Sequence, residues 1–219
     1  MKIAILGYGK MGQAIEKIAL EREHEITLKT NSQNPADNAD FSAVDVAIDF
    51  STPTTAFSNI SAALLKGVPV VSGTTAWLEK QKEAEQIAIN NDTAFLHASN
   101  FSIGVNLFFE LNKKLAQLMK NQELYTANIK EIHHIHKLDN PSGTAISLAK
   151  DMSKKIKIES VRTGEVPGTH IITYQSKIDN IEIKHEAHNR KGFALGAILA
   201  AEWIKEKKGV FSMSDILNQ

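Results

Sequence analysis

The chain has 219 residues, of which 42% are hydrophobic and 23% are charged, so it can form one large domain or two small ones with real cores. Its 25 basic residues balance its 25 acidic residues, so no overall charge favours nucleic acid or an anionic membrane as a partner. There is no cysteine, which excludes disulfides and thiolate catalysis. No apolar stretch is long enough for a signal peptide or a membrane span, and we therefore expect a cytoplasmic protein.

The first hundred residues alternate between short apolar runs and longer stretches of helical spacing. We expect strands at 2–6, 25–29, 44–50, 68–72 and 94–97. We expect helices between them at 13–23, 55–66 and 78–90. This alternation predicts a parallel sheet with helices on both faces and a ligand crevice where the strands end. Small polar residues follow three of the expected strands, at 49–53, 72–75 and 98–102.

The pattern changes beyond Phe101. We expect a long helix at 105–120, a strand at 125–134 and a second helix at 146–155. Strand-like runs with no helices between them then favour a mixed or antiparallel open sheet, at 160–163, 168–176 and 180–187. A helix rich in small residues, at 192–203, is expected to pack closely against the first domain. The predicted fold is therefore α/β, with a Rossmann-type parallel-sheet domain (1–101 with 193–219) and a smaller α+β domain with an open mixed sheet (102–192).

A glycine turn follows the first expected strand and opens the first expected helix. Gly7 permits the tight turn, Gly9 lets a pyrophosphate touch the backbone, and Gly12 allows close packing of helix on strand. The strand, turn and helix context is the one that dinucleotide binding requires, so we expect a dinucleotide site here. The alternative is a glycine-rich turn that binds nothing.

A second segment, 131–145, places proton-transfer groups directly against an anion-binding turn. Three imidazoles and an ammonium come first, from His133, His134, His136 and Lys137. Ser142, Gly143 and Thr144 then open an expected helix, whose first backbone N–H groups have no partner within the helix. A small substrate that carries carboxylates can be held and protonated in such a place. The alternative is a basic surface loop followed by a capped helix.

These motifs, in this order and spacing, resemble those of the dihydrodipicolinate reductase (4-hydroxy-tetrahydrodipicolinate reductase) family of the diaminopimelate route to lysine. The most specific is the His-His-x-x-Lys and Ser-Gly-Thr element inside 131–145. The resemblance covers nearly the whole chain, through 7–12, 49–53, 73–75, 98–106, 164–165, His170, 183–185, Arg190 and 193–196. Two departures are Ala76, where the family usually has glycine, and a shortened stretch at 151–162.

The resemblance implies a role for each matched residue. His133 would be the catalytic histidine and Lys137 the proton donor, acting on a cyclic imine dicarboxylate. The substrate carboxylates would be held by His134, Ser142, Gly143 and Thr144. The nicotinamide cofactor, NADPH and/or NADH, would be lined by Gly7, Tyr8, Gly9, Lys10, Met11, Gly12, Gly73, Thr74, Thr75, Ala98, Ser99, Asn100 and Phe101. The family analogy also implies a hinge near Phe101 and Phe193 and a homotetramer assembled through the second domain.

The choice of cofactor depends on the end of the second strand. A strict NAD enzyme usually has Asp or Glu about 20 residues beyond the glycine turn, and that carboxylate repels a 2′-phosphate. Here Asn31 stands at this place, with Ser32 after it and Lys29 before it. We therefore expect Asn31 to contact the cofactor and NADPH to be accepted at least as well as NADH. The alternative is that Asn31 only caps a turn.

Two rival functions remain from the sequence. One is a catalytically silent Rossmann-type protein that senses a dinucleotide, which would not need Lys137 and the histidine pair. The other is a semialdehyde-type dehydrogenase, whose thiol-dependent members need a cysteine that this chain lacks. No metal is expected, because His185 and His188 have no carboxylate or cysteine at ligand spacing.

Overall fold

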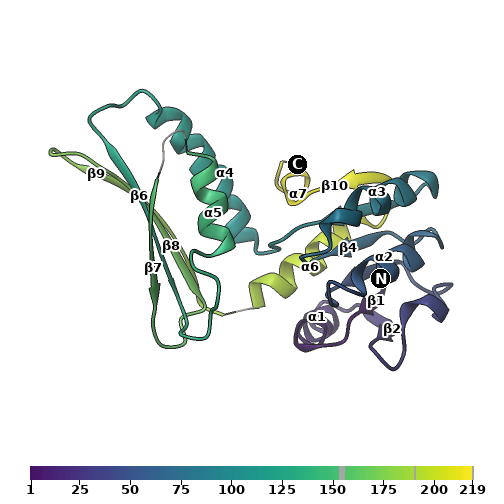
Figure 1. The fold of residues 1–219 in the computed structure, drawn as a ribbon. Helices are drawn as coiled ribbons and strands as arrows, with labels where there is room; N and C mark the ends of the chain where they lie inside the picture. The colour runs from purple at the N-terminus through teal and green to yellow at the C-terminus, as the bar shows by residue number, and fades with distance from the viewer. Residues whose placement is uncertain (153–155, 190, 219) are drawn as a thin grey trace. The chain divides into compact units, whose positions relative to one another are not determined.

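The computed structural model describes residues 1–152, 156–189 and 191–218 (Figure 1). The chain divides into two compact units, Met1–Ser102 with Lys191–Gln219, and Ile103–Arg190. Arg190 and the last residues of the helix expected at 146–155 lie outside the described residues.

The first unit is built on a six-stranded parallel sheet in the order β10-β5-β4-β3-β1-β2. All five strands expected in the first hundred residues are present. The strands are β1 (Lys2–Leu6), β2 (Glu25–Thr30), β3 (Val46–Asp49), β4 (Val70–Ser72), β5 (Ala94–His97) and β10 (Gly209–Phe211). The sequence analysis missed β10, because three residues are too few to show a strand period. This strand exists because the C-terminal chain returns and pairs Gly209 with Ala94.

Helices cover both faces of this sheet, as the alternating pattern predicted. They are α1 (Lys10–Glu21), α2 (Ala56–Leu64), α3 (Gln81–Asn90), α6 (Lys191–Ile204) and the short α7 (Met213–Leu217), with two 3₁₀ turns, η1 (Ala36–Asn38) and η2 (Leu78–Lys80). Ala4 and Leu6 of β1 share a core with α2 and α3. Ile3 and Ile5 are also fully buried and point to the opposite face, where α1 packs beside α6.

Helix α6 packs closely on the first unit because its buried face consists largely of small residues. Ala194, Ala197, Ala200 and Ala201 are all fully buried. Gly196 lies so close to the end of the loop after β5 that an added Cβ would stand 1.7 Å from the carbonyl oxygen of Phe101. This confirms the expectation that the small-residue helix returns to the first domain.

The second unit is a four-stranded mixed sheet in the order β7-β6-β8-β9, as expected, with its helices on one face (Figure 1). The strands are β6 (Thr126–His133), β7 (Lys157–Arg162), β8 (Gly168–Gln175) and β9 (Asn180–Ala187), and the helices are α4 (Ile103–Met119) and α5 (Gly143–Lys150). Strands β6 and β7 run parallel, whereas β8 is antiparallel to both β6 and β9. Ile129 and Ile172 are fully buried in a core with Leu148 of α5.

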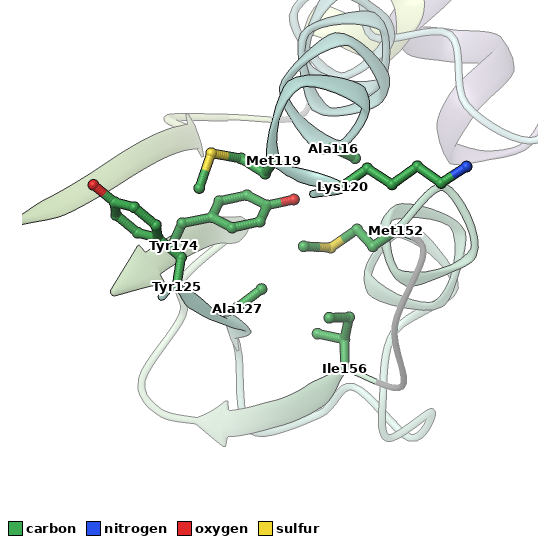
Figure 2. Close-up of a pocket in the computed structure, with 8 residues that line it drawn as sticks. All are labelled: Ala116, Met119, Lys120, Tyr125, Ala127, Met152, Ile156 and Tyr174. Carbon is green, nitrogen blue, oxygen red and sulfur yellow. The ribbon is translucent and has the colours of Figure 1, made fainter. Parts of the chain in front are cut away.

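A mostly apolar pocket lies at the start of β6, where α4 ends (Figure 2). Met119, Met152 and Tyr174 line it, and Figure 2 shows the Tyr174 ring reaching into it. It extends the core of this unit and contains none of the predicted site residues. None of the described helices is long and apolar enough to cross a membrane.

Ala76, which departs from the family pattern, has a left-handed backbone with φ 61°. This conformation costs a non-glycine residue about 1–2 kcal/mol. A change to glycine removes that cost, but the greater entropy of glycine in the unfolded chain cancels part of the gain.

We predict that Ala76→Gly raises the free energy of unfolding by about 0.5–1 kcal/mol. Urea denaturation measures it. Ala39→Gly is the control, because Ala39 has φ −76° and the same change should lower stability there. A loss of stability in Ala76→Gly would contradict the argument.

Candidate active site

The glycine turn after β1 leaves the start of α1 open. At Gly7 (φ 95°) an added Cβ would stand 2.5 Å from the Phe50 carbonyl oxygen, and at Gly12 it would stand 2.6 Å from the Gly7 carbonyl oxygen. At Gly9, which begins α1, an added Cβ meets nothing within 4 Å. Packing therefore leaves no room for a side chain at Gly7 or Gly12, whereas the space beside Gly9 is open. Among the described residues no side chain caps this helix, so its first N–H groups can receive a phosphate.

A buried carboxylate organises the neighbouring loops of the first unit. Asp49, at the end of β3, is fully buried and accepts hydrogen bonds from the hydroxyls of Ser51 (2.6 Å), Ser72 (2.9 Å) and Thr74 (2.7 Å). Burial raises the pKa of Asp49, and the hydroxyls oppose that rise. Since the Thr74 hydroxyl is engaged inside, this residue can meet a cofactor only through its backbone. Gly73 must be glycine, because an added Cβ would stand 2.2 Å from the Phe50 ring.

The loop after β5 joins the same edge of the sheet. The Ala98 N–H donates to the Ser72 carbonyl oxygen (3.1 Å), and the Asn100 side chain accepts from the Ser102 N–H (2.9 Å). Phe101 is 1% exposed, and its ring lies 5.7 Å from that of Phe50. The predicted cofactor residues after β1, β4 and β5 therefore lie at the carboxyl end of one parallel sheet, where such sheets bind ligands.

Asn31 caps a turn, which is the alternative that the sequence analysis left open. Its Oδ1 accepts from the N–H groups of Gln33 (2.9 Å) and Asn34 (3.0 Å), so only its amide nitrogen is left for a ligand. Lys29 forms an ion pair with Glu16 at 2.5 Å, which reduces the positive charge it can lend to a phosphate.

In the second unit, the end of β6 carries a buried polar cluster. Glu131 and His133 point to the same face because they stand two residues apart on a strand. Glu131 is fully buried, and His133, Ser142 and His170 are each less than 10% exposed. The Glu131 carboxylate contacts His133 Nδ1, and the rings of His133 and His170 meet edge to face at 5.1 Å. Ser142 Oγ lies 3.2 Å from His170 Nε2.

Arg162, at the end of β7, ties this cluster to the loop that follows β6. Its Nη2 donates to the Glu131 carboxylate (2.8 Å) and to the Asp139 carbonyl oxygen (2.6 Å). The parallel register places Arg162 directly beside His133. One guanidinium therefore fixes both the buried carboxylate and the loop that carries Lys137.

Lys137 pairs with a carboxylate of its own loop. Lys137 Nζ lies 2.7 Å from the Asp139 carboxylate, and this ammonium is the main cause that lowers the pKa of Asp139. Ser142 caps α5 by accepting the Ala145 N–H (3.2 Å), and an added Cβ at Gly143 meets nothing within 4 Å. The capped helix is what the alternative expected, and anion binding at the start of α5 stays a prediction.

The other two histidines of the motif do not join the buried cluster. His136 is exposed and lies 3.4 Å from Glu165, and its ring is 6.1 Å from that of His134. Thr144 is half-buried in the first turn of α5. The Glu131 position could have been recognised from the strand period, whereas Arg162 and His170 reach the site only through the pairing of β7 and β8 with β6.

Burial controls the protonation of the histidines. It lowers the pKa of His133, and it lowers the pKa of His170 to about 4, so both rings are neutral near pH 7. Ligand atoms of Glu131, His133 and His170 lie within 4.8 Å of one another, which is a spacing that a metal ion can use. Arg162 already occupies the Glu131 carboxylate, and its positive charge opposes a cation there. The cluster is better suited to proton transfer than to metal binding.

The fold and the site define a class of protein: a two-domain Rossmann-type oxidoreductase whose second unit supplies proton-transfer groups and an anion-binding turn. Comparison with known families then identifies the family. Residues 1–101 match the model of the dihydrodipicolinate reductase N-terminus, and residues 104–217 match the model of its C-terminus. The chain belongs to the dihydrodipicolinate reductase family.

Individual relatives agree with this assignment. The chain is 49% identical to a 4-hydroxy-tetrahydrodipicolinate reductase of Christiangramia forsetii, over 100% of this chain and 98% of the relative. It is 35% identical to one of Thermosipho africanus, over 100% and 99%. The fold is shared with the dipicolinate-bound dihydrodipicolinate reductase of Paenisporosarcina sp. TG-14, with a TM-score of 0.79, 24% identity and 97% of each chain covered.

The buried His170 makes stability depend on pH. Its pKa falls from 6.5 to about 4 on folding, so between these values the unfolded chain binds a proton that the folded chain does not. Stability should therefore fall as the pH drops below 6.5. We predict that His170→Gln loses about 2 kcal/mol less than the unmodified protein between pH 7 and pH 5, as measured by urea denaturation. Exposed His188→Gln is the control, and equal losses in all three proteins would contradict the prediction.

Proposed function

We propose that the chain catalyses the reduction of 4-hydroxy-tetrahydrodipicolinate to tetrahydrodipicolinate with NADPH or NADH, in diaminopimelate and lysine biosynthesis. The family to which the chain belongs supports this reaction. The observation that carries it in the site is the Lys137 ammonium paired with the Asp139 carboxylate at 2.7 Å, in the loop that leads into the start of α5. A substrate carboxylate needs two partners, an ammonium and an open helix N-terminus.

The proposed chemistry divides between cofactor and protein. When bound, the reduced nicotinamide supplies the hydride. The overall reaction consumes one hydride and one proton and releases the 4-hydroxyl group as water. Lys137 donates the proton, and its positive charge stabilises the electron-rich ring as the hydride arrives. His133 touches the reacting ring as a neutral imidazole, while His134, Ser142, Gly143 and Thr144 hold the carboxylates.

We assign the cofactor to the first unit and the substrate to the second. The open start of α1 would receive the pyrophosphate. The loops 73–75 and 98–101 would line the nicotinamide, and the Asn31 amide nitrogen would donate to the adenosine ribose or its 2′-phosphate. We expect the enzyme to work in the cytoplasm, where reduced nicotinamide cofactors are supplied.

We also propose a homotetramer assembled through the second sheet. Half-buried Ile132, Val161 and Ile171 lie on the face of this sheet opposite α4 and α5. The neighbouring Ile172 points the other way and is fully buried in the core. A row of apolar residues between charged ones suits an interface between copies of the chain.

The first test of this function is turnover by Lys137→Ala. The unmodified protein should oxidise reduced nicotinamide only when the freshly made condensation product of pyruvate and aspartate semialdehyde is present. We predict that Lys137→Ala lowers kcat by about 10²- to 10⁴-fold, because the proton donor is lost. Cofactor binding, measured by fluorescence titration, should be unchanged.

The matched control is Lys150→Ala, which removes an exposed ammonium from the last turn of α5. It should keep a normal kcat. A substrate-independent signal in the unmodified protein would refute the reductase activity, whereas a near-normal kcat in Lys137→Ala would refute only the proton donor.

The second test concerns the cofactor. With no carboxylate at position 31, NADPH should be accepted at least as well as NADH. We predict that Asn31→Asp raises KM for NADPH about tenfold and changes KM for NADH little, because the new charge repels the 2′-phosphate. Aspartate can still accept the N–H groups of Gln33 and Asn34, so the turn is preserved. A strong preference of the unmodified protein for NADH would overturn the assignment of Asn31.

A further inference from the structure

We propose that Glu131 positions the catalytic His133, by holding the proton on its Nδ1 and leaving the Nε2 lone pair for the substrate. The proposal rests on the proposed function, in which His133 touches the reacting ring. It adds a residue with no contact to substrate and states which nitrogen of His133 carries the proton.

Glu131 and His133 are in direct contact. Glu131 Oε2 lies against His133 Nδ1 as an ion pair, and among the described residues neither atom forms a hydrogen bond with a third group. Both atoms are buried, so water does not compete for them. A carboxylate accepts but cannot donate, and beside a neutral imidazole it selects the tautomer whose proton lies on the facing nitrogen. Nε2 of His133 must then be an acceptor.

Glu131 itself is held in place from its other oxygen. Oε1 accepts from Arg162 Nη2 at 2.8 Å and from the Ser142 N–H at 3.2 Å. Burial acts to raise the pKa of Glu131, but the hydrogen bonds, first that from Arg162 and then those from Ser160 and Ser142, outweigh it, so the carboxyl stays ionised. Strand β7 and the start of α5 thus fix Glu131, and Glu131 in turn fixes His133.

The Nε2 side of the ring is kept open by a glycine. An added Cβ at Gly168 would stand 3.0 Å from His133 Nε2, and the backbone there has φ 155°. His170 supports the ring from β8, at 5.1 Å between ring centroids. The ring is therefore held at Nδ1 and supported by His170, and free at the atom that the proposal gives to the substrate.

A different reading is that Glu131 only neutralises the half-buried Arg162. Both readings predict that Glu131 matters for stability, because removal of one partner leaves a buried charge without compensation. They differ in what happens to His133. Only a positioning role predicts a defined tautomer in the unmodified protein, and a change of tautomer when the carboxylate is replaced.

The kinetic experiment is Glu131→Gln. The amide can donate its N–H to His133 Nδ1 and so favour the wrong tautomer, as carboxylate-to-amide changes beside a catalytic histidine do in serine proteases. We expect kcat to fall about 10²- to 10⁴-fold, with KM changed much less. Glu159→Gln is the matched control, because Glu159 lies on β7, is largely exposed and pairs with Lys130. It should leave kcat unchanged.

The pH profile adds a readout that a structural role would not move. The charged and titratable groups facing His133 are Glu131 on the same strand, Lys137 in the following loop, Arg162 on β7 and His170 on β8. Of these, only Glu131 raises the pKa of His133 through its charge. Since the proposal requires neutral His133, the acid limb of kcat/KM should move to lower pH in Glu131→Gln.

The decisive measurement needs no active variant. In the unmodified full-length protein labelled with ¹⁵N-histidine, His133 is identified by the signal that is missing in His133→Gln. We expect a protonated Nδ1 and an unprotonated Nε2 near neutral pH, and the opposite tautomer overturns the proposal even if Glu131→Gln does not fold. A Glu131→Gln protein with near-normal kcat and an unchanged acid limb also overturns it. Absence of turnover in the unmodified protein would refute the reductase function and leave the tautomer result standing.

Discussion

The second unit is organised by one ion pair, between the buried Glu131 and the half-buried Arg162. Arg162 reaches across from β7 to the central strand β6 and also holds the Asp139 carbonyl oxygen. The pair thereby joins two parallel strands, the loop that carries Lys137, and, through the Ser142 N–H, the start of α5. Burying the Glu131 carboxylate costs desolvation energy that hydrophobic packing would avoid. In exchange, the Arg162 hydrogen bonds connect the β6 carboxylate to the loop at Asp139.

The first unit also contains a buried carboxylate that receives hydrogen bonds, but its donors are hydroxyls and not a guanidinium. Asp49 lies fully buried at the end of β3 and gathers hydroxyls from Ser51, Ser72 and Thr74. These residues start the loops that follow β3 and β4. In both units, therefore, a buried carboxylate at the end of a central strand orders the loops where a ligand is expected. A buried polar network destabilises the fold if one of its groups lacks a hydrogen bond. Here each carboxylate oxygen of Asp49 has a hydrogen-bond donor.

The neutral histidines give the site its chemical character. Burial keeps His133 and His170 uncharged near pH 7, so the positive charges that face His133 are Lys137 and Arg162. Arg162 is engaged with Glu131, and in the proposed function Lys137 supplies the proton. This division suits a reaction in which negative charge builds on a dicarboxylate ring and one proton must arrive with the hydride. A protonated His133 would compete with Lys137 for the same task.

Local pattern was enough to predict much of this protein. The strand period and the helix spacing predicted both sheets. The run 131–145 predicted a strand end, a turn and a helix, because these features are set by residues near one another. Tertiary structure decided what depends on residues far apart. Strand β10 exists only because the chain returns beside β5, and Arg162 and His170 enter the site only through the register of β7 and β8 on β6. The sequence around Asn31 is compatible with a turn cap and with a cofactor contact. Only the folded loop shows that its side-chain oxygen accepts hydrogen bonds from two backbone N–H groups. The physical reason is that paired strands lie far apart in the sequence, so a short stretch of sequence does not contain both partners.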